Sequence, residues 1–430
     1  MCHVGRHRRR SGSGPAPLDP SGRTDPMPSG RPAKALVIGA GIGGLTCAVA
    51  LKRVGVDVEV YERATELREV GAALAVMSNA VTALAALDID LGLDERGRVV
   101  ESFTIADRRG RRIRDLPFGE VCDRVGARSF CLSRADLQQA LLTRLADCPL
   151  HMGATANGFE AGDEGVTVRF TDGRSARGNV LVGADGFNSA VRRHLMGPEK
   201  ARDSGYHFQL GIVPFRHPRL PPGGVRQYWG DGQRFALVDL GHGRCYWWAN
   251  MSNHVPAPDR VKEALEKAYR NWADEVRGAI EATPQEDILT VPSQDRPHLE
   301  QWGDGPITLL GDAAHPMLTT LAQGAGTAIE DAVVLAGALS ESATGGDPVS
   351  ALRVYERRRR DRTRTMVTES RLTDEFQQAA GPLRTSLRDI RLRLTPRRVL
   401  AQRLTRQLTF PHDPQAAPYT EPRLDSLELR

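Results

Sequence analysis

Hydrophobic and polar positions along the chain first form a regular pattern near residue 35. Residues 35–38 are a short apolar run of the kind found in a buried strand, and apolar positions at helical spacing continue through Val54. Gly55 ends this helix, and residues 56–61 alternate between apolar and polar positions, as a half-buried strand does. The pattern therefore predicts a strand, a helix and a second strand, which is how a βαβ unit begins.

The pattern continues with a helix and a hairpin. Residues 134–147 predict an amphipathic helix, for which Ser133 is a suitable N-cap. Residues 166–174 predict a β-hairpin, because an Asp-Gly pair stands at the turn. Three further segments are expected to form two buried strands and a helix, at residues 180–182, 307–310 and 327–339.

The character of the chain changes between residues 205 and 300. Short β-type runs there, separated by glycine-rich turns, carry the aromatic residues Tyr228, Trp229, Phe235, Tyr246, Trp247 and Trp248, and a helix is expected near residues 259–281. We interpret this part as an antiparallel sheet domain inserted into the first fold. Residues 350–409 are expected to be helical and rich in Arg, whereas residues 1–33 are expected to be a disordered tail and residues 410–430 a second tail.

Composition and charge exclude several classes of protein. Of the 430 residues 40% are hydrophobic, and no apolar run approaches the roughly 18–20 residues of a membrane-spanning helix, so we expect no integral membrane association. The formal net charge is +5, but residues 1–34 hold six Arg and one Lys against two Asp, and residues 341–430 hold 18 Arg against 12 acidic residues. The stretch between them carries a net charge of −6. A body with this charge is not expected to bind nucleic acid.

The cysteines give no sign of a metal site or of a disulfide framework. The six Cys are scattered, with no C-x-x-C pair and no histidines at metal-ligand spacing. We therefore expect reduced thiols and no bound metal. The N-terminal arginines are not followed by the apolar core of a signal peptide, so we expect a cytoplasmic protein.

The turn between the first strand and the first helix contains the pattern G-x-G-x-x-G. Its glycines are Gly39, Gly41 and Gly44, and they allow a tight turn in which a pyrophosphate approaches the amides of the helix N-terminus. Glu62 ends the second strand, 18 residues after Gly44, where an acid that binds an adenosine ribose is expected. The motif predicts a bound dinucleotide, and by itself it leaves NAD and FAD open.

Two later segments narrow the choice of cofactor. Residues 182–192 follow a predicted strand and combine Asp-Gly with Ser-x-x-Arg. Residues 309–316 (LLGDAAHP) end another strand, and residues 323–327 (QGAGT) open the helix that follows. With the first motif, their order and spacing resemble the class A FAD-dependent monooxygenases, the family of para-hydroxybenzoate and salicylate hydroxylases, zeaxanthin epoxidase and FAD-dependent urate hydroxylase. The resemblance extends over residues 34–400.

The resemblance implies an α/β fold. It consists of a Rossmann-like FAD-binding domain of the GR2 type, an inserted antiparallel-sheet substrate domain and C-terminal helices. The FAD-binding domain is expected in two parts, residues 34–204 and 301–345, with substrate-domain segments interleaved near 75–130. The sheet domain is expected at residues 205–300 and the C-terminal helices at residues 346–409.

The resemblance also assigns an FAD site. The glycine turn, Glu62 and Arg63 match the part that binds ADP, and Arg134 matches an Arg that reaches toward the phosphates and the ribityl chain. Asp185 belongs to a segment that contacts FAD and nicotinamide, and Asp312 matches the acid that binds the ribityl chain. The complete set of expected cofactor-binding residues is Gly39, Gly41, Gly43, Gly44, Glu62, Arg63, Arg134, Asp185, Asp312, Pro316, Gly324, Ala325 and Gly326.

For the reaction, the resemblance implies a monooxygenase that uses NAD(P)H and O2. Reduced FAD is expected to form a hydroperoxyflavin that hydroxylates or epoxidises an electron-rich aromatic or polyene molecule, in secondary metabolism or aromatic catabolism. No second G-x-G-x-x-G follows a predicted strand, so NADPH or NADH is expected to bind transiently. The chain is expected to be a monomer or a homodimer.

The resemblance places two substrate residues in the inserted sheet. Arg234 and Tyr246 stand where FAD-dependent urate hydroxylase keeps an active-site Arg and Tyr, so Arg234 is expected to orient an anionic or phenolic substrate and Tyr246 to hydrogen-bond or deprotonate it. Both positions are equally consistent with ordinary sheet residues. Trp247 and Trp248 point to opposite faces of one strand, so at most one of them lines a pocket.

Some positions depart from the family pattern. In residues 319–324 the usual Pro is replaced by Thr, and Ala322 replaces the first Gly of a Gly-Gln-Gly. Thr320 replaces an acid of urate hydroxylase, and Ala86 replaces its pocket His. These changes disfavour a polar, urate-like substrate and favour a larger, more apolar aromatic or polyene molecule.

Three other functions share part of this pattern. A flavin-dependent reductase or desaturase of isoprenoids would not couple NAD(P)H oxidation to O2 consumption. A flavin-dependent halogenase needs a W-x-W-x-I-P segment and a pocket Lys, whereas this chain has Tyr246-Trp247-Trp248 and no Lys between Lys52 and Lys200. A non-enzymatic FAD-binding regulator would use the Arg-rich ends of the chain to contact nucleic acid.

Overall fold

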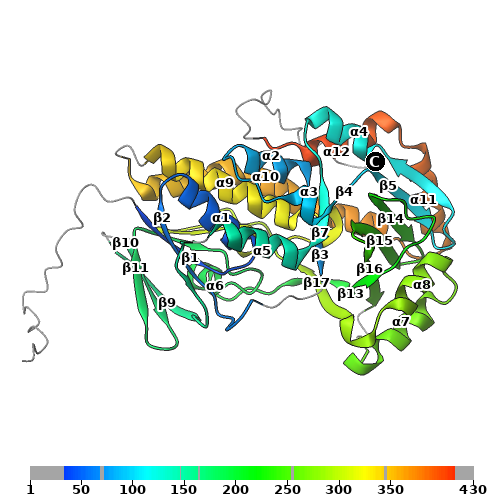
Figure 1. Cartoon of the computed structure of the whole chain (residues 1–430), viewed down its shortest axis with the longest axis horizontal. Helices are drawn as coiled ribbons and strands as arrows, with labels where there is room; N and C mark the ends of the chain where they lie inside the picture. The colour runs from blue at the N-terminus through cyan, green and yellow to red at the C-terminus, as the bar shows by residue number, and fades with distance from the viewer. Residues whose placement is uncertain are drawn as a thin grey trace, which may run out of the picture. The chain divides into compact units, whose positions relative to one another are not determined.

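Five parallel strands form the sheet at which the fold begins (Figure 1). In spatial order they are β18 (Ile307–Leu309), β12 (Val180–Gly183), β1 (Lys34–Ile38), β2 (Asp57–Tyr61) and β8 (Leu150–His151). Val37, Val60 and Val182 on the inner strands are completely buried. Burial on both faces explains why β1 and β12 appear in the sequence as short apolar runs, and the parallel sheet with its helices confirms the expected α/β fold.

The structure is a computed structural model. The residues that it describes are 33–67, 72–145, 147–162, 165–252, 256–342 and 346–411. The two expected tails therefore lie outside the described residues, apart from residue 33 and residues 410–411.

Helices cover one face of the parallel sheet. There α1 (Ile42–Arg53) contacts both α5 (Arg134–Arg144) and α9 (Gly324–Ser342). Ala48 on α1 and Ala332 on α9 are fully buried, and small side chains allow two helix backbones to approach closely. The expected cap of α5 is confirmed, because Ser133 Oγ accepts a hydrogen bond from the Asp136 amide at 3.0 Å.

A three-stranded antiparallel sheet packs near the other side of the parallel sheet (Figure 1). Its strands are β9 (Ala156–Gly162), β10 (Gly165–Phe170) and β11 (Ser175–Gly178). The expected hairpin is confirmed between β10 and β11, and Gly173 at its turn has a φ of +85°. A second small sheet, which contacts both α9 and the sheet domain, consists of β3 (Ala73–Val76), β7 (Phe130–Ser133) and β4 (Arg98–Val99).

The second large sheet has seven strands. Their spatial order is β17 (Leu289–Asp295), β13 (Arg202–Pro214), β16 (Arg244–Ser252), β15 (Arg234–Gly241), β14 (Gly224–Trp229), β5 (Ser102–Asp107) and β6 (Arg112–Leu116). Five strands come from residues 202–295, whereas β5 and β6 come from residues 102–116. All neighbours are antiparallel except β14 and β5, and residues 108–223 between these two strands supply the long connection that a parallel pair requires.

Two short helices cover the outer face of the seven-stranded sheet. They are α7 (Val261–Tyr269) and α8 (Asp274–Ala282), so the prediction of one helix near residues 259–281 is wrong. The break occurs where Trp272 is buried against Tyr269, and the amide of Ala273 donates to the carbonyl of Arg108 instead of continuing a helix. A tertiary contact therefore interrupts a segment whose local sequence favours helix.

Three helices end the described chain, and the first of them reaches from the parallel-sheet part of the molecule to the seven-stranded sheet (Figure 1). They are α10 (Pro348–Gln377), α11 (Pro382–Leu394) and α12 (Arg397–Leu408). Gly381, with a φ of +88°, and Pro396 separate them. The remaining helices are α2 (Ser78–Ala85), α3 (Leu93–Arg96), α4 (Phe118–Val125) and α6 (Ala190–Met196). None of the helices described here combines the length and apolar character needed to cross a bilayer.

Candidate active site

The glycine turn after β1 is closed on one side and open on the other. Gly39 has a φ of +106°, and a Cβ there would lie 2.4 Å from the carbonyl oxygen of Ala184. A Cβ on Gly44 would lie 1.9 Å from the Gly39 carbonyl oxygen, so the turn tolerates no side chain at either position. A Cβ on Gly41, at the N-cap of α1, would meet nothing within 4 Å. The amides at the start of α1 therefore face open space, which fits a bound pyrophosphate.

Glu62 lies beside this turn at the end of β2. Its Oε2 accepts a hydrogen bond of 2.7 Å from the Ala40 amide, and its Oε1 accepts one of 2.9 Å from the Ala64 amide. Gln138 of α5 donates to the carbonyl oxygen of Ala40 at 3.1 Å. These bonds fix an acidic group next to the open side of the turn. Arg63, the adjacent expected site residue, is exposed.

A carboxylate and a guanidinium without hydrogen-bond partners lie near each other beyond the turn. Asp312 follows β18 and Arg134 begins α5, and neither side chain makes a hydrogen bond or an ion pair within the described residues. Although the Asp312 side chain is partly open to solvent, the dense protein around its carboxyl raises its pKa, and the charges of His315 and Arg134 oppose that rise. A Cβ on Gly324, the first residue of α9, would lie 3.9 Å from Asp312 Oδ1. Unpaired groups of both signs and a helix N-terminus thus lie near one another, an arrangement that fits FAD.

A buried ionic network holds the segment that carries Asp312. Asp331 of α9 accepts a hydrogen bond of 3.0 Å from the Gly311 amide, lies 2.5 Å from His315 Nε2 and pairs with Arg359 of α10 at 2.7 Å. Burial alone would raise the pKa of Asp331, but the charges of His315 and Arg359 outweigh it and lower the pKa to about 2. Arg359 was not predicted as a functional residue, because it stands in a run of four arginines, a pattern typical of a solvated surface.

The loop between Pro316 and α9 has one strained residue. Pro316 is buried, whereas Gly324 and Ala325 are half-buried and Gly326 is buried. Ala322 has a φ of +52°, a left-handed conformation that glycine adopts more readily than alanine. The backbone conformation gives a physical reason for the glycine that the family has at this position.

Asp185 is engaged at the N-terminus of α6. Its carboxylate accepts hydrogen bonds from the Ser189 hydroxyl and from the Ala190 amide, the latter at 2.6 Å. Burial raises the pKa of this carboxyl, and the hydrogen bonds oppose the rise. The preceding residue, Ala184, forms the wall against which Gly39 turns. Asp185 therefore lies beside the glycine turn with its side chain already used as a cap.

Arg234 lies on the inner face of the seven-stranded sheet with an acidic partner. Its side chain is 1% exposed, and its guanidinium donates to Asp374 Oδ1 at 2.7 Å, to the Tyr206 hydroxyl at 2.9 Å and to Gln377 Oε1. Asp374 and Gln377 come from α10, 140 and 143 positions further along the chain. The Thr320 hydroxyl also donates to Asp374 Oδ1 at 3.2 Å. The carboxylate of Asp374 therefore lies beside the loop in which Thr320 replaces the acid of urate hydroxylase.

The neighbouring strand supplies Tyr246 and the two tryptophans. Trp247 is fully buried on the outer face and donates to Thr283 Oγ1 at 2.8 Å, whereas Trp248 lies on the inner face, with its ring 5.6 Å from the Arg234 guanidinium carbon. Tyr246 shares this inner face, and its hydroxyl makes no hydrogen bond within the described residues. Burial raises the pKa of Tyr246, so the phenol stays protonated near neutral pH and is suited to donate a hydrogen bond, not to act as a base.

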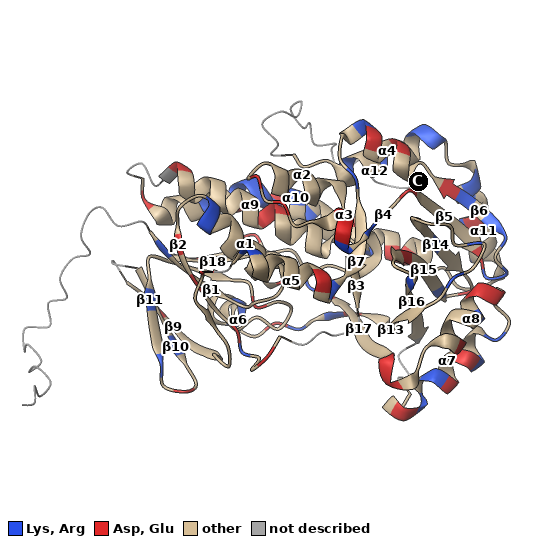
Figure 2. Cartoon of the chain, viewed as in Figure 1, with Lys and Arg blue, Asp and Glu red and all other residues tan. Residues whose placement is uncertain are grey.

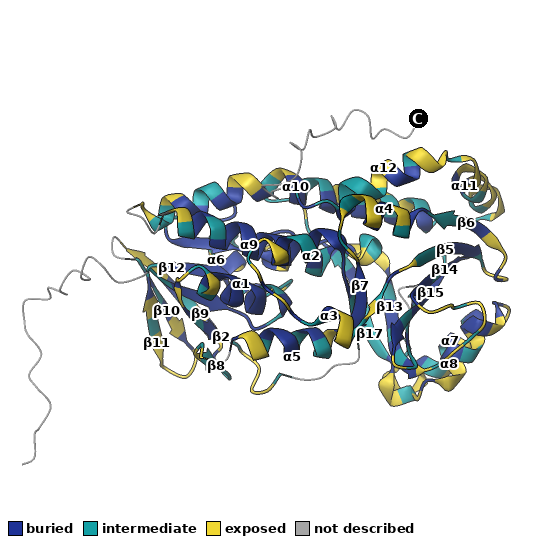
Figure 3. Cartoon of the chain, turned by 45° about the horizontal axis from the view of Figure 1, so that its top comes forward, coloured by how far each residue is buried: buried dark blue, intermediate teal, exposed yellow. Residues whose placement is uncertain are grey.

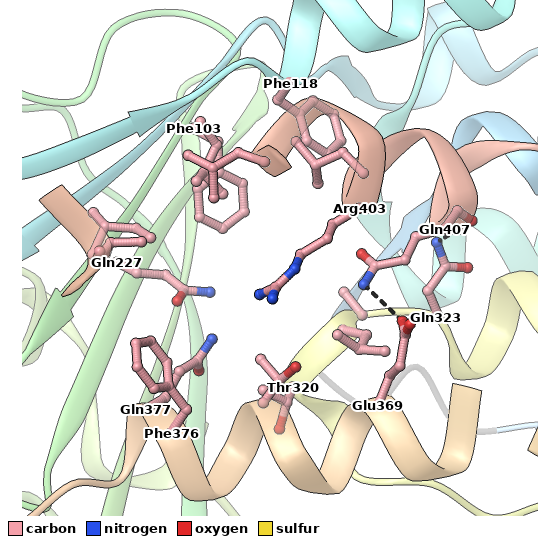
Figure 4. Close-up of a pocket in the computed structure, with 18 of the residues that line it drawn as sticks. Phe103, Phe118, Gln227, Thr320, Gln323, Glu369, Phe376, Gln377, Arg403 and Gln407 are labelled. Atoms are coloured by element: carbon pink, nitrogen blue, oxygen red, sulfur yellow. Dashed lines mark hydrogen bonds between the residues drawn. The ribbon is translucent and has the colours of Figure 1, made fainter. Parts of the chain in front are cut away.

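A cavity of about 270 Å³ lies between the inner face of the sheet, α10, α11 and α12 (Figure 4). Its wall is mainly apolar and includes Phe103, Ile105, Phe118, Trp229, Phe376 and Leu404. Residues 320–323, which lead directly into Gly324, form another part of the wall. The cavity is therefore adjacent to the loop that starts α9. Ala86, which stands where urate hydroxylase has a pocket His, is exposed and does not line the cavity. The replacement of that His by Ala86 therefore says nothing about the substrate of this protein.

Arg403 places a guanidinium group in the wall of this mainly apolar cavity. Figure 4 shows its side chain reaching from α12 into the space between Gln227 and Thr320. It forms no hydrogen bond or ion pair within the described residues, and the carboxylate of Glu369 is bonded to Gln407 Nε2 at 3.2 Å. Desolvation and two nearby arginines lower the pKa of Arg403 from its usual value. No pattern in the sequence marks this residue, because a single Arg in an Arg-rich amphipathic helix is usually a surface group.

No group of three or more His, Cys, Asp or Glu side chains suited to a metal ion occurs in the described ranges. The five cysteines within those ranges are free thiols, and Cys2 lies outside them.

Comparison with known proteins identifies the family. The model of the FAD binding domain matches residues 32–370. The chain is 37% identical over 342 residues to aurachin C monooxygenase/isomerase of Stigmatella aurantiaca (78% of this chain, 87% of that protein) and 34% identical over 348 residues to FAD-dependent urate hydroxylase of Klebsiella pneumoniae (79% and 88%). The crystal structure of Klebsiella pneumoniae HpxO with FAD and uric acid superimposes with a TM-score of 0.82 at 30% identity (87% of this chain, 96% of that chain). The chain thus belongs to the FAD-binding domain family of the class A FAD-dependent monooxygenases, and FAD is its cofactor.

Proposed function

We propose that this protein is a monooxygenase that takes electrons from NADPH or NADH and inserts one atom of O2 into an apolar aromatic or polyene molecule, by hydroxylation or epoxidation. The second oxygen atom leaves as water. The observation that carries the proposal is a shared wall, since residues 320–323 line the apolar cavity and lead directly into Gly324 at the FAD site. A substrate in the cavity would lie next to the cofactor.

Residues of this chain suit the ADP half of FAD, its phosphates and its ribityl chain. The glycine turn and Glu62 suit the ADP half, and Arg134 and Asp312 suit the phosphates and the ribityl chain. When bound and reduced, FAD supplies the activation of oxygen. The amides at the start of α9 stabilise negative charge at the FAD site without an added cation. The ion pair of Asp331 and Arg359 keeps the Asp312 segment in place.

The substrate cavity has two tasks. Its apolar wall excludes water, which would otherwise divert the activated oxygen to hydrogen peroxide. Arg403, whose guanidinium reaches into the cavity and has no partner within the described residues, binds an acidic group of the substrate, because an Arg fork pairs with a carboxylate through two hydrogen bonds. We therefore propose a substrate with an apolar, conjugated body and an acidic substituent.

The proposed roles of the two sheet residues follow from their partners. Arg234 is already paired with Asp374, so we propose that it positions Gln377, which lines the cavity, and does not hold the substrate itself. Tyr246 is proposed to donate a hydrogen bond from its hydroxyl to the substrate. Both residues lie on the sheet face that borders the cavity.

The reaction class is tested on the purified full-length protein. We expect flavin absorbance, NAD(P)H oxidation stimulated by some members of a panel of phenols, polycyclic aromatics and polyenes, O2 consumption, and a product heavier by one oxygen atom. A colourless protein that fails to bind added FAD would refute the proposal. NAD(P)H oxidation with substrate but without O2 uptake would favour a reductase or desaturase instead.

The role of Arg403 is tested with acid and amide pairs of one aromatic body, such as 2-naphthoate and 2-naphthamide. Isothermal calorimetry on the holoenzyme should show that Arg403→Gln weakens 2-naphthoate binding by at least tenfold and leaves 2-naphthamide unchanged. The matched control is Arg398→Gln on the same helix, since Arg398 is exposed and does not line the cavity. Equal effects on acid and amide would contradict the assignment.

A further inference from the structure

The exposed apolar side chains of this molecule gather in one place. Among the described residues, the large hydrophobic side chains that are exposed are Leu372, Leu383, Leu387, Ile390 and Leu394. Four of them belong to α11, and their exposed fractions run from 49% to 76%. Positions 383, 387, 390 and 394 recur at helical spacing and so form one stripe along α11, visible as exposed residues on this helix in Figure 3.

The stripe is not a loosely packed core face. The opposite side of α11 is buried through Arg388 and Leu392, which are 4% and 6% exposed. Arg388 donates to the carbonyl oxygens of Gly230 and Gln377, both at 3.0 Å, which fastens the helix to the body. The helix is therefore held in an orientation that presents its leucines to the outside.

The surroundings of the stripe are strongly basic. Residues 381–411 contain eight Arg and a single acidic residue, Asp389, which is paired with Arg388 at 2.9 Å. Arg384 and Arg393 on α11 and Arg398 at the start of α12 are exposed and have no acidic partner within the described residues. Figure 2 shows the resulting blue patches on α11 and α12. An apolar stripe flanked by arginines is the composition of a helix that lies in a membrane interface.

We propose that α11 docks this protein on an anionic lipid surface, with its stripe in the boundary between headgroups and acyl chains. Leucines gain from burial in the acyl region, and each nearby arginine gains from the negative surface potential. The same charge argues against a second copy of the chain as the occupant, since two such faces would bring two strongly positive segments together.

Docking would place the substrate cavity at the membrane. Arg391 and Leu392 of α11 line the cavity, and so does Leu372, the fifth exposed hydrophobic residue. The helix that bears the stripe is thus also a wall of the cavity, so an apolar substrate would pass from the lipid with little exposure to water. The docking itself does not depend on the proposed function.

The test is flotation of the full-length holoprotein with phosphatidylcholine vesicles that contain or lack one quarter phosphatidylglycerol. We expect binding to the anionic vesicles and at least a tenfold lower partition coefficient for Leu383→Gln/Leu394→Gln. Both leucines are exposed, so the variant should keep its FAD content. The matched control is Ser386→Gln, which introduces the same residue at an exposed polar position of α11 and should bind like the wild type. The leucine variant is compared with the wild type and with the Ser386→Gln control because the six Arg of residues 1–34 also carry positive charge and are present in every variant.

Several results would overturn the proposal. One is equal binding of the wild type and the double leucine variant, and another is no binding by the wild type. A wild-type dimer that the leucine substitutions dissociate, measured by sedimentation velocity without vesicles, would assign the stripe to a second copy. Binding that appears only when residues 412–430 are deleted would assign it to this chain's own C-terminal segment. Flotation requires no turnover, so a failed activity assay leaves this result interpretable.

Discussion

The ion pair between Arg234 and Asp374 yields the sharpest quantitative prediction. The Arg234 side chain is 1% exposed and the Asp374 side chain 6%, so Arg234→Gln leaves a carboxylate in the interior without its cation. Loss of one partner of such a buried pair costs about 3–5 kcal/mol. With an unfolding entropy of about 2.1 cal/mol/K per residue, or about 0.9 kcal/mol/K for a chain of this length, the melting temperature should fall by about 3–6 °C.

The assay is thermal unfolding in excess FAD, combined with a double-mutant cycle. Asp374→Asn should also destabilise the protein, but the double variant should lose about 1–3 kcal/mol less than the sum of the two single variants, because both charges are then absent. Arg244→Gln is the matched control, since Arg244 pairs with Asp136 while both side chains are 34% exposed, and it should shift the melting temperature by about 1 °C or less. An additive cycle, or an Arg234→Gln shift no larger than that of Arg244→Gln, would refute the reasoning.

Three further predictions concern the FAD site and stability. Asp312→Ala should lower FAD affinity at least tenfold while the fold persists; unchanged flavin content in the purified variant would remove Asp312 from the FAD site. Ala322→Gly should stabilise the protein by about 1 kcal/mol in the same melts, because the φ of +52° strains alanine; a lower melting temperature would contradict this. Burial and the charge of Arg364 lower the pKa of His298 to about 4, so the unfolded chain takes up this proton more readily and stability should fall as the pH drops from about 6.5 to 4. His298→Gln should flatten the melting-temperature profile in that window, and an unchanged profile would exclude His298 as the cause.

The boundary of the family match falls within the lining of the cavity. The match ends at residue 370, so it contains every residue that we place at FAD. Gln377, Arg391 and Arg403, which give the cavity much of its polarity, lie after it. The proposed FAD site therefore lies wholly within the matched residues, whereas the cavity is lined both by matched residues and by residues that follow them.

The local elements of the fold were predictable because each rests on short-range chemistry. The βαβ start, the hairpin at Gly173 and the cap at Ser133 depend on glycine conformations, turn residues and apolar periodicity within a few positions. The helix near residues 259–281 was predicted wrongly because Trp272 finds a buried site against Tyr269, and that site exists only after the sheet has formed.

The sequence by itself determined that this chain binds FAD and belongs to its family. Each motif is contiguous, and the roles of its glycine and acidic residues depend on their immediate neighbours in the chain. Only the tertiary structure decided how charges pair and where a ligand fits. Asp374 meets Arg234 across 140 positions, and Arg359 meets Asp331 across 28. Such partners depend on the placement of α10 against the sheet and α9, which no local pattern encodes. The unpaired state of Arg403 and the exposed stripe of α11 follow for the same reason: periodicity marks an amphipathic helix, but packing alone decides which of its faces is covered.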